Sequence, residues 1–475
     1  MTAFDADVLV VGCGPVGVMT ALRAAQRGLR VIAIDRSEEI YPLPRALGMD
    51  DEIQDLFIRA GLGAELRAHS APLQGAEFLD ATGERVVGVD LPDGSVGALG
   101  HPPVVTFDQP GLERALRRGA IDAGVDLRLG LDAYSIADLD DGVRVGVGTS
   151  HDDSTLTARW LVAADGAKST MRSLRQIAMV DQGFDQTWLV VDTTVLDPDL
   201  DLPRLARQYC DPARVCTFVP GPARHRRWEF QLRPDETRDD MLDETIIAEL
   251  LAPWGTTTQL RIDRAAVYRF HATVAERFRD GPVFLAGDAA HQMPPFNGQG
   301  MCTGMRDAEN LTWKFAAVND GFASDPLLDT YDNERRPHAT GQVEHSKDAG
   351  ELMQAIACGD RAALDSGYGQ RSFPKLSGPL FEPGHPCVGG MLPAAAVPLD
   401  PLPNGWLVLT STSIDVPALL PAKPIVVPDG CFPGLVDAHH SVVVRPDRHI
   451  AAVTADLAQT TRRLAPFAGA MTTPT

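Results

Sequence analysis

The sequence lacks the features of a membrane or secreted protein. No apolar stretch approaches the ~18 residues that a bilayer-spanning helix needs. No basic segment followed by a cleavable apolar segment stands near Met1, which argues against a secretory signal. The seven cysteines are dispersed and include no Cys-x-x-Cys pair, so disulfides and a zinc site are not expected. We therefore predict a cytoplasmic protein with reduced thiols and no bound metal.

Basic side chains are also scarce. The chain has 43 Lys and Arg residues against 64 Asp and Glu residues, which gives a formal net charge of -21. A surface of that sign repels nucleic acid and anionic membranes, so neither is an expected partner. The composition, 44% hydrophobic and 23% charged, is that of a globular protein, and the length of 475 residues predicts two or three domains.

A glycine-rich turn near the N-terminus has the pattern of a dinucleotide-binding site. The apolar run 8–11 leads into Gly12-Cys13-Gly14-Pro15-Val16-Gly17, and the next apolar run ends at Asp35. Gly12 permits a sharp exit from the strand, Gly14 lets the backbone approach a pyrophosphate, and Gly17 lets the helix pack close to the sheet. Asp35 is placed to accept hydrogen bonds from the adenosine ribose. The residues expected to hold this part of the cofactor are Gly12, Gly14, Pro15, Val16, Gly17, Asp35 and Arg36.

Two later strand ends carry similar signals. Asp165-Gly166 follows the apolar run 160–164, and Gly287-Asp288 follows the run 282–286. Ligands of α/β sheets gather at such strand ends. Together with the glycine turn, the order and spacing of these motifs predict one bound FAD, and the Asp288 carboxylate can hold a hydroxyl of its ribityl chain. Pro295 then stiffens the chain, and Gly298 to Gly300 let the backbone approach a flat ring. A helix that begins near Gly300 directs its N–H groups at the flavin pyrimidine.

Two further interpretations follow from these motifs. Only one dinucleotide fingerprint occurs in the chain, so a nicotinamide donor would have to bind transiently. His291, which follows Gly287-Asp288-Ala289-Ala290, is interpreted as a structural hydrogen-bonding residue in preference to a proton-transfer group.

The order of the segments predicts an α/β fold in which a Rossmann-like FAD-binding domain carries an inserted antiparallel-sheet substrate domain and a small C-terminal domain follows. The FAD-binding domain is expected at 1–70, 101–180 and 276–350. The substrate-binding sheet is expected at 71–100 and 181–275. A linker or irregular segment is expected at 351–404, where proline and glycine are dense, and the C-terminal domain at 405–475.

The motifs resemble those of the group A flavoprotein monooxygenases, which are single-component FAD-dependent aromatic hydroxylases. The resemblance runs over roughly 7–350 and is strongest to the hydroxylases of 3-(3-hydroxyphenyl)propionate. It includes Pro44-Arg45-Ala46-Leu47-Gly48-Met49-Asp50-Asp51-Glu52 and Gly304-Met305-Arg306-Asp307-Ala308-Glu309-Asn310-Leu311. The segment 444–452 also resembles the ending of those enzymes. In that family such C-terminal domains are similar to thioredoxin without redox cysteines.

The resemblance assigns roles to single residues. Arg45 and Gln109 match positions that contact FAD, and Asp165 matches a motif linked to FAD and the nicotinamide donor. Asp288 matches the ribityl contact. The residues matched to the flavin-binding loop and the helix after it are Gly287, Pro295, Gly298, Gly300, Met301 and Asn310.

The implied reaction is hydroxylation of a phenol, either a hydroxyphenylpropionate or a hydroxycinnamate. NADH or NADPH reduces FAD, dioxygen adds to form the flavin C4a-hydroperoxide, and the phenol ring attacks the distal oxygen. Tyr268 is the first candidate for assisting the phenol, with His271 and Tyr209 as weaker ones. Three arginines are candidates to hold a substrate carboxylate, and the residues alone do not choose among Arg207, Arg214 and Arg227.

Other functions stay open on the sequence. A hydroxylase of polycyclic aromatics in a biosynthetic pathway shares the same motifs. A flavin-dependent halogenase is disfavoured by the missing Trp-x-Trp-x-Ile-Pro signature, and a non-catalytic FAD-binding protein is a third alternative. The expected partners are a small aromatic substrate, dioxygen, NADH or NADPH and, in a homodimer, a second copy of the chain.

Overall fold

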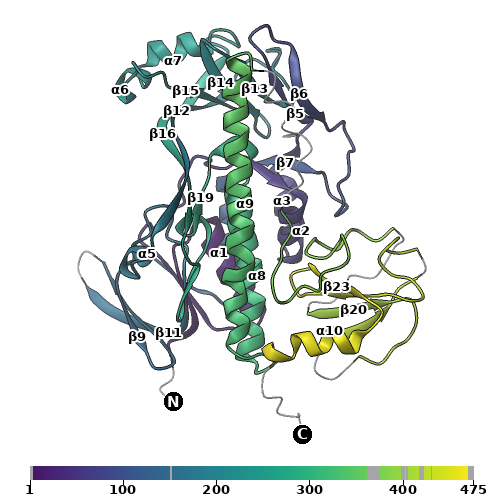
Figure 1. The fold of residues 1–475 in the computed structure, drawn as a ribbon. Coiled ribbons are helices and arrows are strands. Elements are labelled where there is room, and N and C mark those ends of the chain that lie inside the picture. Colours follow the sequence, from purple (N-terminus) through teal and green to yellow (C-terminus); the bar gives the residue numbers. More distant parts are fainter. Residues whose placement is uncertain are drawn as a thin grey trace.

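The computed structural model is a mixed α/β protein (Figure 1). It describes residues 4–149, 152–360, 374–396, 402, 405–416, 422–428 and 430–468. In these residues no helix is both long and apolar enough to cross a membrane.

The first sheet surrounds the N-terminal glycine turn. Its centre consists of five parallel strands in the order β18-β11-β1-β2-β8, and α1 connects β1 to β2. Because both faces of β1 are covered, its residues Val8 to Val10 are at most 1% exposed, as expected for a central parallel strand. The strands are β1 (Ala6–Val11), β2 (Val31–Asp35), β8 (Asp126–Leu129), β9 (Asp132–Leu139), β10 (Gly142–Gly148), β11 (Asp153–Ala163), β17 (Arg279–Asp280) and β18 (Val283–Leu285).

The second sheet lies at the top in Figure 1 and has the order β19-β16-β12-β15-β14-β13-β5-β6. All its neighbours are antiparallel except β13 and β5. Its longest strands, β12 and β16, extend down towards the first sheet, so the two sheets meet near the glycine motifs. The strands are β5 (Gly75–Leu79), β6 (Arg85–Asp90), β12 (Met179–Val195), β13 (Ala206–Asp211), β14 (Arg214–Pro220), β15 (His225–Gln231), β16 (Leu260–Ala275) and β19 (His291–Gln292).

Alternation along the strands gives the second sheet two different faces. On the outer face, Trp228 and Phe230 pack with Ile247 and Leu251 of α7. On the other face, which we call the inner face, Trp188 packs with Met353 of α9. The inner face therefore points towards α9 and the first sheet.

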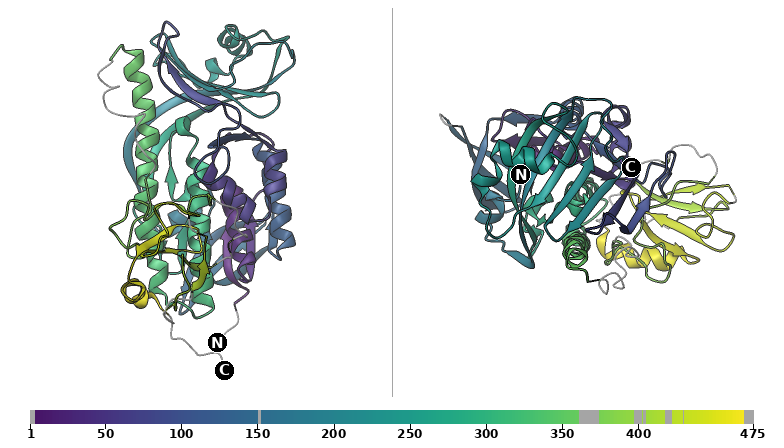
Figure 2. Two further views of the ribbon diagram at one scale, coloured as in Figure 1. Left: turned by 90° about the vertical axis from the view of Figure 1, so that its right-hand side faces the viewer. Right: turned by 90° about the horizontal axis from the view of Figure 1, so that it is seen from above.

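The helices are α1 (Pro15–Gln26), α2 (Asp51–Arg59), α3 (Gly63–Ala68), α4 (Gln109–Asp122), α5 (Thr170–Leu174), α6 (Arg238–Met241), α7 (Glu244–Leu251), α8 (Gly300–Asn319), α9 (Pro326–Ala357) and α10 (Leu457–Leu464). Figure 2 shows α9 running along the side of the molecule beside α8 and up to the second sheet. The expectation of an irregular segment from 351 is wrong at its start. Leu352, Met353 and Ile356 bury apolar side chains against the second sheet, and this packing keeps the helix intact as far as Ala357.

Two smaller sheets complete the structure. One has the order β3-β7-β4 and consists of β3 (Gly48–Asp50), β4 (Ser70–Pro72) and β7 (Val104–Phe107). The other has the order β21-β20-β22-β23 and consists of β20 (Trp406–Thr410), β21 (Ala422–Val426), β22 (Ser441–Val444) and β23 (Ile450–Thr454). Parts of the expected linker and C-terminal domain, at 361–373, 397–401, 403–404, 417–421, 429 and 469–475, lie outside the described residues.

Candidate active site

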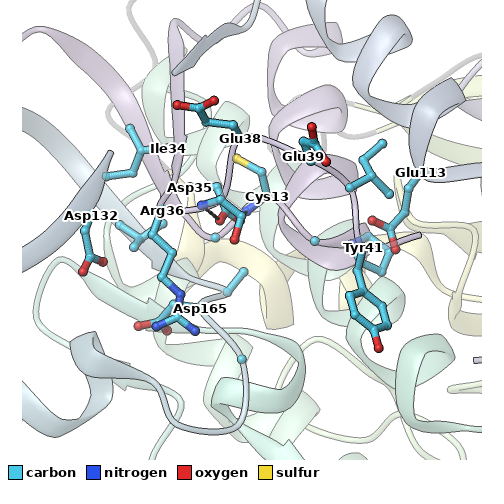
Figure 3. A pocket seen from close by; sticks show the side chains of 18 of the residues that line it. Cys13, Ile34, Asp35, Arg36, Glu38, Glu39, Tyr41, Glu113, Asp132 and Asp165 are labelled. Atoms are coloured by element: carbon cyan, nitrogen blue, oxygen red, sulfur yellow. Dashed lines mark hydrogen bonds between the residues drawn. The ribbon is translucent and has the colours of Figure 1, made fainter. Parts of the chain in front are cut away.

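A cavity of about 610 Å³ lies where β1, β2 and β11 end (Figure 3). Its volume is within the range of small-molecule sites. It brings together residues that are more than 150 positions apart in the chain, and eight of the predicted cofactor-binding residues line it: Gly12, Gly14, Pro15, Asp35, Arg36, Arg45, Gln109 and Asp165.

The glycine turn has the geometry that the sequence predicts. Gly12 has φ of 101°, a conformation that favours glycine. A Cβ on Gly17 would lie 1.8 Å from the carbonyl oxygen of Gly12, so the helix can pack here only without a side chain. At Gly14 no described atom lies within 4 Å of the Cβ position. The space next to Gly14 is therefore free for a phosphate at the N-terminus of α1.

Six acidic residues line this cavity. Two of them, Asp35 and Asp165, accept backbone hydrogen bonds, and one of these two has an unmet hydrogen bond. Asp35 accepts hydrogen bonds from the backbone N–H groups of Cys13 at 2.6 Å and Ser37 at 2.8 Å. The Oδ2 atom of Asp165 accepts a hydrogen bond from the Met171 N–H at 3.1 Å. Its Oδ1 atom is buried and has no partner among the described residues. Buried polar atoms are nearly always paired, so a cofactor with hydroxyl or N–H donors fits this wall.

Cationic side chains stand among the acidic ones in the cavity wall, although they are fewer. The lining includes the four cationic side chains Arg36, Arg45, Arg117 and Lys168. Figure 3 shows Arg36 and Asp165 on one side of the cavity and Tyr41 and Glu113 on the other. Together with the N-terminus of α1, these cations can hold a pyrophosphate.

The loop at 44–46 is held in place by side chains from two other elements. Gln109 accepts hydrogen bonds from the N–H groups of Arg45 at 2.8 Å and Ala46 at 2.7 Å. From the second sheet, Arg227 donates to the carbonyl oxygens of Pro44 at 2.5 Å and Arg45 at 2.7 Å. The buried side chain of Gln109 therefore serves this loop, and Arg227 connects the loop to the inner face.

The loop at 287–300 is organised around the buried carboxylate of Asp307. Asp307 accepts hydrogen bonds from the Gly287 N–H at 3.1 Å and Arg335 Nε at 2.8 Å, and it pairs with His291 Nε2 at 2.7 Å. Burial alone raises the pKa of Asp307, but His291 and Arg335 hold it below its usual value. His291 is fully buried and bonded to Asp307, as expected of a structural hydrogen-bonding residue.

Most of the remaining predicted cofactor residues lie in or against the 287–300 loop and the first turn of α8. The side chain of Val16 is 3.2 Å from the Cβ position of Gly287, and Gly298 approaches Gly48 so closely that its Cβ position lies 3.7 Å from the Gly48 Cα. Asp288, the residue after Gly287, is exposed. The others, Pro295, Gly300 and Met301, are half-buried in η2 (Pro295–Asn297) and the first turn of α8.

Three further predicted site residues, Asn310, Tyr268 and His271, do not line this cavity. Asn310 lies ten positions into α8, about 15 Å along the axis from Gly300, and it donates to Glu334 at 2.8 Å inside the protein. Tyr268 and Phe270 share one face of β16, where their rings stack at 6.4 Å. His271 points to the opposite face, where its side chain is 41% exposed and 3.8 Å from Asp185. A flavin-proximal Asn310 and a catalytic His271 therefore stay predictions, and neither side chain lines the cavity at the glycine turn.

A cluster that the sequence did not indicate joins the inner face to the 44–46 loop. Asp192, which is fully buried, accepts from Arg227 Nε at 2.8 Å and Arg264 Nε at 2.9 Å and pairs with His225 at 2.9 Å. Arg264 in turn donates to the Tyr268 hydroxyl at 3.2 Å. These residues come from three strands, so only the strand register reveals the cluster.

The Asp192 cluster should make stability depend on pH. Burial alone raises the pKa of Asp192, but His225, Arg227 and Arg264 lower it to about 2 from an ordinary 3.8. Ionised Asp192 therefore stabilises the fold above pH 4 by about 2 kcal/mol, and this contribution is lost as the pH falls towards 2. We expect Asp192→Asn to lower the free energy of unfolding at pH 7 by at least that amount. Urea titrations from pH 7 to pH 3 should show the free energies of unfolding of the wild type and Asp192→Asn converging. A difference that stays constant over this pH range would contradict this interpretation.

A second cavity, of about 650 Å³, lies between α1, α8 and β20. Arginine and aromatic side chains contribute to its wall, including Arg27, Trp313 and Trp406. None of the predicted cofactor residues lines it. The cavity next to the glycine turn is therefore the candidate cofactor site.

Comparison with known proteins gives a consistent result. The family model described as an FAD binding domain matches residues 5–346. The chain is 35% identical over 354 residues to 3-(3-hydroxy-phenyl)propionate/3-hydroxycinnamic acid hydroxylase of Comamonas testosteroni. This match covers 74% of this chain and 59% of that protein. For the protein of the same name from Mycolicibacterium smegmatis the identity is 35% over 351 residues, with coverages of 73% and 61%. The matched part thus spans about three fifths of these relatives' length.

Solved structures are similar over more of the chain. A ternary complex of aklavinone-11 hydroxylase with FAD and aklavinone has a TM-score of 0.83 and 24% identity, and the match covers 98% of this chain and 100% of that one. At this identity the likeness concerns the fold alone. The p-nitrophenol 4-monooxygenase of Pseudomonas putida has a TM-score of 0.68 and 25% identity, with coverages of 77% and 94%.

Proposed function

This chain belongs to the family of FAD-binding domains, and we propose that it is an FAD-dependent monooxygenase that hydroxylates a phenolic ring, with NADH or NADPH as reductant. The observation that carries the proposal is the convergence of three distant glycine motifs with the inner face of the second sheet. The glycine turn and Asp165 supply a dinucleotide site. The loops at 44–48 and 295–300 lie between that site and the sheet.

Aromatic side chains form a wall above these loops, and a space next to this wall would contain little water. Phe296 of η2 packs against Trp188 of β12 at 5.1 Å and against Phe270 of β16 at 6.4 Å, measured between ring centroids. The side chain of Trp188 is fully buried. A substrate ring that enters between the 44–48 loop and β16 would be held by such surfaces, and water would be excluded from it.

The cofactor and the chain have separate tasks in this proposal. FAD, when bound, supplies the electron transfer and the activation of dioxygen. The chain holds the cofactor through the α1 N-terminus, Asp35 and Asp165. Arg227 fixes the 44–46 loop, and the N-terminus of α8 favours negative charge near Gly300.

We assign the substrate site to the second sheet, which corresponds to the predicted regions 71–100 and 181–275 inserted into the FAD-binding domain. The described part of 405–475 is consistent with a small separate domain with its own apolar core, which includes Leu407, Val442 and Ile450. A thioredoxin-like origin of this domain remains part of the proposal.

The substrate that the curated relatives favour is a hydroxyphenylpropionate or hydroxycinnamate. A polycyclic phenol is the second candidate, because the fold likeness to aklavinone-11 hydroxylase extends over nearly the whole chain. A non-catalytic FAD-binding protein is the third, and activity measurements distinguish it from the others.

The test is NADH and NADPH oxidation by the purified holoprotein with a panel of phenols. The panel contains 3-(3-hydroxyphenyl)propionate, 3-hydroxycinnamate and one polycyclic phenol. We expect a phenylpropanoid to accelerate oxidation and to gain one oxygen atom by mass. Turnover of the polycycle alone would support the second candidate. Bound FAD that no nicotinamide donor reduces, with or without these phenols, would contradict a monooxygenase.

The positions of Tyr268 and His271 predict different effects on turnover. Tyr268 lies on the inner face and its hydroxyl is held by Arg264, whereas His271 lies on the opposite face. We expect Tyr268→Phe to reduce the rate of product formation by about a hundredfold, the lower end of the range for a group that transfers a proton. The matched variant His271→Gln should remain within about twofold of the wild type. Equal effects of the two substitutions would contradict the assignment of the inner face.

A further inference from the structure

A buried carboxyl group on the inner face has no hydrogen-bonding partner. Glu229 of β15 is 4% exposed. Within the described part of the chain nothing hydrogen-bonds to its carboxylate, and the nearest cationic atom is Arg227 Nη1 at 4.0 Å. A buried carboxylate without a partner is destabilising. A contribution to the stability of the fold therefore does not explain why a carboxyl group is buried at this position.

Alternation along β15 places Glu229 on the side of the substrate site. Its neighbours in sequence, Trp228 and Phe230, point to the outer face and pack with α7. Two positions away in either direction, Arg227 donates to the 44–46 loop, and Gln231 accepts a hydrogen bond from Gln354 of α9 at 2.7 Å. Glu229 therefore points between these two contacts, towards the loops that hold the cofactor.

Short side chains flank Glu229 on the neighbouring strands. Its partners in register are Val190 on β12 and Thr217 on β14, and beyond Val190 lies Ala266 on β16. These side chains are short. The neighbouring row of the sheet contains Tyr268 and Trp188, which face each other across β16 and β12. The carboxyl of Glu229 thus lies one row from the aromatic wall and one row from Arg227.

Burial keeps the Glu229 carboxyl partly protonated near neutral pH. Burial raises the pKa of Glu229 to about 7, although Arg227 and Arg264 lower it, and Asp192 raises it further. The buried Cys216 thiol on β14 is a further titratable group near it. A carboxyl of this kind can exchange a proton near neutral pH.

We propose that Glu229 accepts the proton of the substrate's phenolic hydroxyl, an inference that rests on the proposed function. The O–H bond of the phenol breaks, its electron pair stays on the phenolate oxygen, and the proton forms a new O–H bond on Glu229. The negative charge then resides on the substrate, where it makes the ring more nucleophilic. Arg227 and Arg264 lie on the side of the site where that charge develops.

The experiment compares two ligands bound to the FAD-loaded protein. They are 3-(3-hydroxyphenyl)propionate and its methyl ether, which has the same ring and chain but no phenolic proton. The proteins are the wild type, Glu229→Gln and the control Glu77→Gln. Glu77 is also a buried carboxylate of the second sheet, but it points to the outer face and is paired with Arg207 at 2.7 Å. Binding is followed by calorimetry and by the change in flavin absorbance.

We expect the wild type and Glu77→Gln to prefer the phenol to the ether by at least about tenfold, because a site built around a hydrogen bond rejects the analogue that lacks it. Glu229→Gln should lose most of this preference. An unchanged preference in Glu229→Gln would overturn the assignment. Failure of the wild type to bind either ligand, repeated with the polycyclic phenol and its ether, would contradict the proposed function and this assignment with it.

A thermal measurement separates this role from a purely structural one. Because the pKa of Glu229 is raised to about 7 in the folded protein, the folded state binds its proton more tightly than the unfolded state. The free energy of unfolding therefore falls as the pH rises from the ordinary pKa of a glutamate to about 7. Glu229→Gln should therefore raise the melting temperature at pH 8 and change it little at pH 4. Glu77→Gln, which breaks an ion pair, should lower the melting temperature at pH 8. A lowered melting temperature for Glu229→Gln at pH 8 would show a structural carboxylate and would overturn the proposal.

Discussion

The Gly17→Ala variant is expected to lose both FAD and folding stability. The added Cβ would lie 1.8 Å from the backbone oxygen of Gly12 and 3.2 Å from the Cβ of Ala164, so α1 has to move away from the sheet. Forcing atoms into a packed core costs about 1–3 kcal/mol, and contact with backbone places this site at the upper end. Urea unfolding of the cofactor-free protein should show this loss, and the purified variant should be colourless.

Gly14→Ala is the matched control, because the same methyl group meets no described atom within 4 Å. This variant should unfold without FAD at nearly the wild-type urea concentration. It should nevertheless bind FAD at least about tenfold more weakly, since the methyl occupies space that the pyrophosphate needs. A yellow Gly14→Ala protein with wild-type affinity would contradict the placement of the phosphates.

Replacing Asp307 by Asn is expected to have the second large effect. The substitution removes the charge that balances Arg335, whose side chain is 1% exposed, and it weakens the bonds to Gly287 and His291. Breaking a buried ion pair by removing one partner costs about 3–5 kcal/mol. Because Asp307 also holds the start of the 287–300 loop, FAD affinity should fall together with the melting temperature.

Asp329→Asn provides the comparison for that experiment. Asp329 pairs with Arg279 at an N–O distance of 2.7 Å, close to the 2.8 Å between Arg335 and Asp307. The side chain of Asp329 is, however, 64% exposed. Such surface pairs contribute about 0–1 kcal/mol, so this variant should keep its FAD and its melting temperature. Similar losses in the two variants would show that burial does not determine the contribution of Asp307.

The local parts of the site could be predicted from the sequence. Gly12, Gly17 and Asp35 act through short-range geometry, in which a strand, a tight turn and a helix follow one another within 30 residues. Asp165 stands at a strand end that its apolar run indicates. The family resemblance added Arg45 and Gln109, whose hydrogen bond spans 64 positions.

The other parts depend on strand register and helix length, which the sequence does not display. His271 and Tyr268 are three positions apart in the chain but lie on opposite faces of β16. Asn310 shares a helix with Gly300, yet the rise of the helix carries it into the protein interior. The roles of Asp192 and Glu229 become recognisable only when β12, β15 and β16 are aligned, because these roles depend on burial and on the side chains across the neighbouring strands.

The most direct test of the central claim is oxygen incorporation under isotopically labelled dioxygen. The FAD-loaded protein is supplied with NADH and 3-(3-hydroxyphenyl)propionate, and the product is analysed by mass spectrometry. Monooxygenation predicts one labelled oxygen atom in the ring of each product molecule and consumption of one NADH for it. NADH oxidation that yields only labelled hydrogen peroxide with this substrate, the hydroxycinnamate and the polycyclic phenol alike would contradict the proposed hydroxylation.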